Sequence, residues 1–229
     1  MDVNNARVVV IAIDGPSGAG KGTVARALAE RLALRHVDTG AMYRAVAWKA
    51  RHDGIELTDE TRVADLARRA IFDLGARVVI DGHDVTSNIR TPDMDAAAAV
   101  VARQPSVRAA LVIRQRGFRI GAGVVMEGRD IGTVVFPDAD VKFYLDASPD
   151  ERARRRLQDP AHSARAVSAS VSDVATALEA RDHSDRTRAT SPLTRADDAV
   201  YLDTTGVPIL DVVERALAIV RERVRALPV

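Results

Sequence analysis

The chain has 229 residues, 47% hydrophobic and 28% charged, which is the balance of an ordinary globular domain with a buried core. Its formal net charge of +1 provides no overall attraction to nucleic acid or to an anionic membrane. It contains no cysteine, which excludes disulfides, thiolate-bound zinc and a cysteine nucleophile.

No stretch approaches the roughly 18 apolar residues that a membrane-spanning helix needs. Residues 1–7 lack the charged-then-apolar pattern of a signal peptide, because residues 8–13 already have the pattern of a core strand. We therefore expect a cytoplasmic protein that binds neither nucleic acid nor membrane.

Short apolar runs rich in β-branched residues predict five buried strands, at Val8–Ile13, His36–Asp38, Val124–Met126, Val141–Leu145 and Val200–Leu202. Between them, helical patterns lie at Gly22–Leu34, Met42–Asp53, Val107–Gly117, Pro149–Asp159, Ser172–Asp182 and Pro208–Ala226. Because strands and helices alternate, the sequence predicts an α/β fold with a parallel sheet covered by helices on both faces.

One segment breaks the alternation. Residues 74–91, LGARVVIDGHDVTSNIRT, alternate with period two around Asp81-Gly82, a pair typical of a tight hairpin turn. Since helical segments flank it, we expect a small antiparallel insertion at about residues 62–104 rather than a second large domain. The core of a single domain would then comprise residues 7–60, 105–150 and 190–229.

The sharpest motif lies between the first predicted strand and a helix, which is the context of a P-loop. Glycines let the backbone N–H groups surround phosphate oxygens, and Lys21 would place its charge on the β- and γ-phosphates of ATP. Gly22 stands where many P-loops have Ser or Thr, which weakens the case for magnesium coordination by a hydroxyl there. The motif predicts an ATP site at Gly15, Pro16, Ser17, Gly18, Ala19, Gly20, Lys21, Gly22 and Thr23.

Two further motifs follow predicted strands, where α/β proteins bind ligands. In DTGAMYR, Tyr43 and Arg44 place a ring beside a guanidinium at a helix start, which suits a base and its phosphate. In EGRDIGT, Arg129 and Asp130 offer a phosphate clamp and a carboxylate. The first pair is also compatible with a core tyrosine beside a solvated arginine, and the second with a structural ion pair.

Two arginine clusters, ERARRR at 151–156 and RDHSDRTR at 181–188, bracket a segment rich in Ser and Ala. Each cluster alone is also compatible with a solvated helix face. Together with a P-loop they predict a closing lid at about residues 151–189, which would bring guanidinium groups onto the transferring phosphoryl group and exclude water.

With these motifs, the chain resembles bacterial cytidylate kinase, a nucleoside monophosphate kinase of the P-loop type, over nearly its whole length. The resemblance implies a three-layer P-loop NTPase-type fold with a five-stranded parallel sheet, a CMP-binding insertion and a lid. It implies transfer of the γ-phosphoryl group of ATP to CMP or dCMP with Mg²⁺, giving ADP and CDP or dCDP. The segments that carry it are residues 13–23, 37–45, 89–91, 127–139, 143–148 and 181–193.

The resemblance also implies roles for single residues. The implied CMP-binding residues are Thr39, Tyr43, Arg44, Arg108, Arg129, Asp130, Asp185 and Arg188. The implied catalytic residues are Lys21, Arg129, Asp130, Arg156, Arg181 and Arg188. Arg44, Arg129 and Arg188 would meet phosphate, Asp130 and Asp185 base or sugar, and Arg156 and Arg181 ATP.

Three further expectations concern the metal, the base contacts and the assembly. Mg²⁺ would be held mainly by phosphates and water, without a direct protein ligand. Relatives often carry a serine where this chain has Ala99, which removes one polar contact expected for the base. We expect a monomer with ATP and CMP or dCMP as its substrates.

Other functions remain open at this point. A related small kinase acting on UMP, AMP or shikimate would have similar phosphate contacts. A nucleotide-dependent switch or binding module is the alternative from another class, although the Asn-Lys-x-Asp guanine-binding motif is absent from the sequence. Because the CMP phosphate is ionised at neutral pH, we expect no general base and no catalytic histidine.

Overall fold

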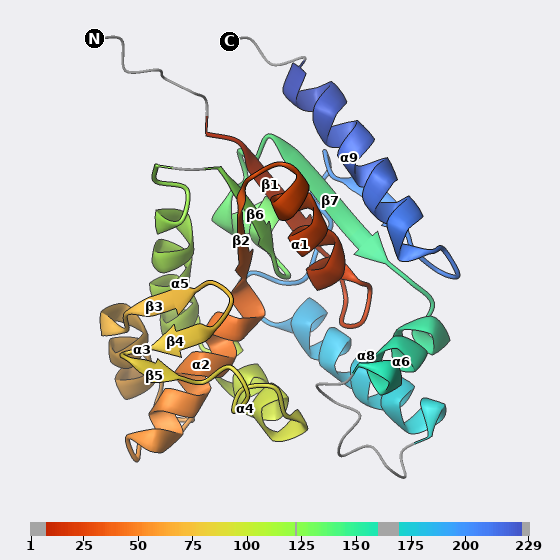
Figure 1. Ribbon diagram of the computed structural model, residues 1–229. Coiled ribbons are helices and arrows are strands. Elements are labelled where there is room, and N and C mark those ends of the chain that lie inside the picture. Colours follow the sequence, from red (N-terminus) through yellow and green to blue (C-terminus); the bar gives the residue numbers. More distant parts are fainter. Residues whose placement is uncertain (1–7, 122, 160–169, 226–229) are drawn as a thin grey trace, which may run out of the picture.

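A five-stranded parallel sheet forms the centre of the protein in the computed structural model, which describes residues 8–121, 123–159 and 170–225 (Figure 1). Its strand order is β2–β6–β1–β7–β8, and every neighbouring pair is parallel. Each predicted strand is confirmed to within a few residues. The strands are β1 (Val10–Asp14), β2 (Arg35–Asp38), β6 (Val124–Glu127), β7 (Val141–Asp146) and β8 (Val200–Asp203).

Helices cover both faces of this sheet, as the alternation of the sequence predicted. α1 (Lys21–Arg31) and α9 (Ile209–Arg225) pack on one face, where Ile11 and Ile13 of β1 contribute to the core. α2 (Thr39–His52) and α5 (Pro105–Gly117) lie on the other, which receives Val10 and Ala12. Because β1 is buried on both faces, its side chains from Val10 to Ile13 are apolar without alternation.

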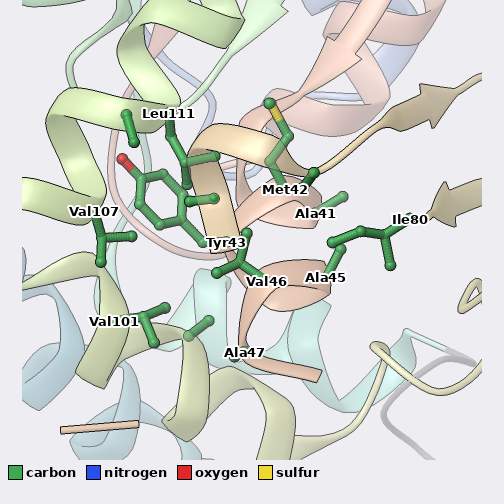
Figure 2. Close-up of a cluster of buried hydrophobic side chains, with 14 of the residues drawn as sticks. Ala41, Met42, Tyr43, Ala45, Val46, Ala47, Ile80, Val101, Val107 and Leu111 are labelled. Atoms are coloured by element: carbon green, nitrogen blue, oxygen red, sulfur yellow. The ribbon is translucent and has the colours of Figure 1, made fainter. Parts of the chain in front are cut away.

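The second of these cores extends away from the sheet. Figure 2 shows Met42, Tyr43 and Val46 of α2 facing side chains of other elements, among them Val107 and Leu111 of α5. This packing fixes α2 against α5. It also places the polar end of Tyr43 close to the region described below as the cavity.

The insertion contains more strand than the sequence predicted. β3 (Phe72–Leu74), β4 (Val78–Ile80) and β5 (His83–Asp84) form a three-stranded antiparallel sheet, flanked by α3 (Glu60–Arg69) and α4 (Pro92–Ala102). The turn predicted at Asp81-Gly82 joins β4 to β5, with φ of 49° and 80° at its two central residues. β3 was missed because all but its last residue lie before residues 74–91, the segment whose alternation predicted the hairpin.

Two helices near the end of the chain, α6 (Pro149–Gln158) and α8 (Val171–Thr187), carry the arginine clusters and pack on each other (Figure 1). Most of the segment between them, which forms the middle of the predicted lid, lies outside the described residues. No single helix in the described part of the chain is long and apolar enough to span a membrane. α4 and α5 meet that test only as a pair, and the chain bends by 100° between them.

Candidate active site

A cavity of about 530 Å³ lies where β1, β2 and β6 end, bounded by α2, α4, α6 and α8. It brings together all the residues that the sequence assigned to a CMP site, from Thr39 to Arg188. Lys21, Arg156 and Arg181 line the same cavity. From the P-loop, it is lined by Ser17, Gly18, Gly20, Lys21, Gly22 and Thr23, whereas Gly15, Pro16 and Ala19 are not among its lining residues.

The P-loop is fixed by close contact with neighbouring elements. Gly15 has φ of 144°, and a Cβ there would lie 2.0 Å from the carbonyl oxygen of Leu145 in β7, so only glycine fits. Lys21 begins α1 and is 6% exposed, and its Nζ donates to the carbonyl oxygen of Pro16 at 2.7 Å. Burial, and then the charge of Arg129, lower the pKa of Lys21 to about 7. Its charged form therefore lacks a full counter-charge in this loop.

The carboxylate of Glu127 lies close to Gly22, the residue after Lys21. A Cβ on Gly22 would lie 2.9 Å from Oε1 of Glu127, the last residue of β6. The same oxygen lies 3.2 Å from Nε2 of His36. A side chain at position 22 would therefore require the carboxylate of Glu127 to shift. The sequence analysis included Glu127 in a motif but did not assign it to the site.

Asp14 connects the P-loop strand with the loop that carries Arg129 and Asp130. Its carboxylate accepts hydrogen bonds from the backbone N–H groups of Ile131 and Gly132, both at 2.8 Å. These residues begin a π-helical turn, Ile131–Val135, that the sequence analysis missed. Burial raises the pKa of Asp14 to about 6, although the two N–H groups act against that shift.

One wall of the cavity combines two buried arginines with a carboxylate and a phenol. Arg108 is 2% exposed, donates to Oδ2 of Asp130 at 2.5 Å, and lies over the ring of Tyr43, 5.4 Å from its centroid. Nη2 of Arg188 is 3.9 Å from the other oxygen of Asp130. Among the described residues, this Nη2 and the Nε of Arg108 are buried without a hydrogen-bond partner. Buried donors are normally satisfied, and both residues line the cavity, so a ligand bound there can supply acceptors for them.

Asp185 of α8 holds the guanidinium groups of Arg129 and Arg188 in place. It accepts from Arg129 Nε at 3.0 Å and from Arg188 Nη1 at 3.1 Å. Burial acts to raise the pKa of Asp185, but these two arginines outweigh it and hold the pKa below its ordinary value. Arg129 also donates to the hydroxyl of Ser17 at 3.1 Å, so it lies directly beside the P-loop.

Arg44 is held in a similar way by Asp38, a residue of its own motif that the sequence analysis did not assign. Arg44 Nη2 donates to Asp38 Oδ2 at 2.9 Å. The other oxygen of Asp38 accepts from the N–H of Ala41 and so caps the start of α2. Burial acts to raise the pKa of Asp38, and Arg44 lowers it enough to give a net decrease.

The arginines of the ERARRR cluster have different environments. Arg156 lines the cavity. Arg152 is instead 3% exposed and pairs with Asp182 of α8 while donating to the carbonyl oxygen of Ser17 at 3.1 Å. Asp182 is fully buried and accepts from the N–H of Ser17 at 2.9 Å. This pair ties α6 and α8 to the P-loop, and the sequence analysis singled out neither residue.

Comparison with known proteins adds the family. The cytidylate kinase family matches residues 11–222. A cytidylate kinase of Solibacter usitatus (strain Ellin6076) is 50% identical over 217 residues, which cover 94% of each chain. One of Desulfitobacterium hafniense (strain Y51) is 47% identical over 218 residues, covering 93% of each. The chain belongs to the cytidylate kinase family.

Membership of the cytidylate kinase family makes this protein a phosphotransferase that uses ATP to phosphorylate CMP or dCMP, as the family resemblance implied. Family membership therefore favours a kinase and excludes the alternative of a nucleotide-dependent switch. The fold is shared with a solved structure from Eubacterium ventriosum ATCC 27560, described as an uncharacterized protein. That likeness has a TM-score of 0.53 at 12% identity and covers 94% of this chain and 99% of the other.

Proposed function

We propose that the cavity of this cytidylate kinase binds ATP at the P-loop and CMP or dCMP on the opposite wall, with the two phosphate ends meeting between them. The observation that carries the proposal is that Arg44, Arg129 and Arg188 line the same cavity as Lys21. Guanidinium groups suit bidentate contact with phosphate oxygens. Had these arginines faced away from the cavity, the assignment would have failed.

The acceptor's base fits the wall formed by Tyr43, Arg108, Asp130 and Arg188. Cytosine has an exocyclic amine that donates and ring atoms that accept. The carboxylate of Asp130 provides an acceptor, and the unpartnered Nε–H of Arg108 provides a donor. Burial raises the pKa of Tyr43 to about 12, so its hydroxyl is neutral and adds no charge there.

The sugar and the start of the acceptor's phosphate fit the neighbouring part of the cavity. Asp185 and Thr39 both line it, and the hydroxyl of Thr39 donates to the carbonyl oxygen of Glu127 at 2.8 Å. Oxygens of these side chains can accept from ribose hydroxyls. Arg44 and Arg129 would then hold the phosphate itself, close to the γ-phosphate at Lys21.

Transfer requires in-line placement and compensation of the charge on the equatorial oxygens, rather than covalent help from the protein. We infer that Lys21, Arg129 and Arg188 supply this charge together with Arg156 and Arg181, while Asp130 orients the acceptor. The phosphate of CMP attacks in its ionised form, so no proton has to be removed.

Mg²⁺ accompanies ATP in this proposal. Glu127 and Thr23 line the cavity beside Lys21 and offer oxygen atoms, the ligand type that Mg²⁺ prefers. When bound, the ion neutralises charge on the β- and γ-phosphates. We expect phosphates and water to supply most of its ligands, with these side chains holding the water.

The test is a coupled assay of ADP release with CMP, dCMP, UMP and AMP as acceptors. We expect kcat/KM to be highest for CMP and dCMP, because Asp130 accepts from the amine that uracil lacks. A clear preference for AMP, or ATP hydrolysis that does not depend on any acceptor, would contradict the proposed acceptor site.

A further inference from the structure

Asp95, in the first turn of α4, lies among three guanidinium groups that come from three other helices. It accepts a hydrogen bond from Arg156 of α6. Its Oδ1 lies 3.3 Å from Nη1 of Arg181 in α8 and 3.7 Å from Nη1 of Arg44 in α2. Its side chain is 13% exposed, and it lines the cavity. The contact joins the insertion to α6 and α8.

These three arginines are among those proposed above to act on the phosphates of the two nucleotides. Their side chains lie close together around Asp95, with Arg129 nearby. Burial is the main cause that lowers the pKa of Arg181, the charges of Arg129 and Arg44 lower it further, and Asp95 opposes this. A carboxylate at this point therefore relieves repulsion among the arginines.

The effect of the Asp95 carboxylate becomes unfavourable when nucleotides bind in the cavity. The phosphates of CMP and ATP carry more negative charge than one carboxylate and need the same N–H groups. Asp95 would then face like charges across a short distance. The arginines cannot serve the carboxylate and the phosphates equally well.

We propose that Asp95 is a built-in counter-ion of the phosphate-binding arginines, which holds α6 and α8 against α4 in the nucleotide-free enzyme and is displaced by the nucleotide phosphates. The proposal rests on the phosphate-binding roles of Arg44, Arg156 and Arg181. Asp95 then acts through the arginines, because it competes with the phosphates for the same N–H groups. Because the contact must break for binding, it also lowers the apparent affinity for both nucleotides.

The same helix offers a matched control. Asp93 also stands in the first turn of α4, so it interacts equally with the positive end of that helix. It pairs with Arg51, is 65% exposed, and is not among the residues that line the cavity. Asp93→Asn thus removes the helix-end charge and an ion pair without touching the arginines of the site.

The experiment compares Asp95→Asn with wild type and with Asp93→Asn by equilibrium titration of the full chain with CMP and with ATP. We expect Asp95→Asn to lower both dissociation constants by about three- to tenfold, because no contact has to be broken. Asp93→Asn should match wild type. Asp95→Ser, which removes the same charge, repeats the test if the asparagine variant fails to fold.

A distance measurement separates a counter-ion from a merely structural group. Since the chain contains no cysteine, Ala96→Cys on α4 and Ala177→Cys on α8 allow site-specific spin labels on two exposed positions. Without nucleotide, Asp95→Asn should broaden the distribution of distances between the two labels and shift it to longer values. With both nucleotides bound, the distributions of wild type and variant should be the same. Unchanged or weaker binding, or an unchanged distance, would overturn the proposal.

Arg156→Met separates a failure of the proposed phosphate role of Arg156 from a failure of the proposed counter-ion role of Asp95. If it leaves ATP binding and turnover unchanged, the proposed phosphate role of Arg156 fails. If it weakens them while Asp95→Asn has no effect on affinity, only the counter-ion role fails. In the Arg156→Met background, the gain in affinity from Asp95→Asn should shrink, because the two residues share one interaction.

Discussion

The two ends of the cavity are built in different ways. The ATP end comes from one continuous stretch, residues 15–23, whose geometry depends on glycine at close approaches such as the one between Gly15 and Leu145. The CMP end is assembled from side chains of α2, α5, α8 and the loop after β6. A phosphate cradle can be made by local backbone, whereas a pocket for a base needs side chains that only folding brings together.

The two ends also differ in how far their positive side chains are paired with carboxylates. Lys21 has a carbonyl oxygen as its hydrogen-bond partner and a pKa lowered to about 7, so its charge is poorly compensated before ATP binds. At the CMP end, the guanidinium groups of Arg44, Arg108 and Arg129 each have a carboxylate partner. The ATP end is thus ready to gain from an incoming anion, and the CMP end is already fixed in geometry.

The largest effect is expected from Lys21→Ala, which breaks the ATP end. Removing a charge that acts on the transferring phosphoryl group should lower kcat by about 10²–10³-fold or more. The fold should persist, because the lysine is buried without full compensation. Turnover measures the loss of activity, and circular dichroism measures the persistence of the fold. Lys49→Ala is the control, because it removes a lysine of α2 that pairs with Asp53. Near-normal phosphorylation by the variant would remove Lys21 from the mechanism.

Asp130→Asn breaks the CMP end by leaving Arg108 buried without its anion. Removing one partner of a buried ion pair costs about 3–5 kcal/mol, so the free energy of unfolding should fall by this order. Denaturant unfolding measures it. Asp138→Asn is the matched control, because its pair with Arg119 is exposed and should contribute less than about 1 kcal/mol. Equal losses in both variants would contradict the role of Asp130 as the anchor of this wall.

The pH dependence of ATP binding tests the lowered pKa of Lys21. Its pKa of about 7 in the free enzyme means that the charge is lost as pH rises, while bound phosphate favours the charged form. The affinity for ATP should therefore fall between pH 7 and pH 9, by up to about tenfold per unit. Calorimetry in buffers of different ionisation enthalpy should show proton uptake on binding at pH 8. An affinity that is flat or rises over this range would be inconsistent with a lowered pKa.

The smallest effect is expected from Ala99→Ser, which adds a hydroxyl to the cavity wall on α4. One additional hydrogen bond is worth about 1 kcal/mol, so discrimination between CMP and UMP should change by a few-fold. The ratio of kcat/KM for the two acceptors measures it. Ala96→Ser, exposed on the same helix, should leave the ratio unchanged. An unchanged ratio in Ala99→Ser would show that the base does not reach this position.

Much of the fold was predictable because its signals are local. The buried strands, the P-loop and the Asp81-Gly82 turn each depend on residues within a short window. The residues of the CMP site were identified through the family resemblance, and the structure brings them to one cavity. By contrast, the π-helical turn at Ile131–Val135 had no local signal, because its start is stabilised by Asp14, far away in sequence.

The sequence alone was enough to predict the succession of core strands and helices along the chain, the position of the ATP loop and the family. Only the folded structure shows which polar groups meet: Arg152 with Asp182, Arg156 with Asp95, and the N–H of Ser17 with Asp182, across separations of 30, 61 and 165 residues. The physical reason is that propensity and periodicity act between neighbours along the chain. An ion pair depends only on distance in space, and that distance is set by packing.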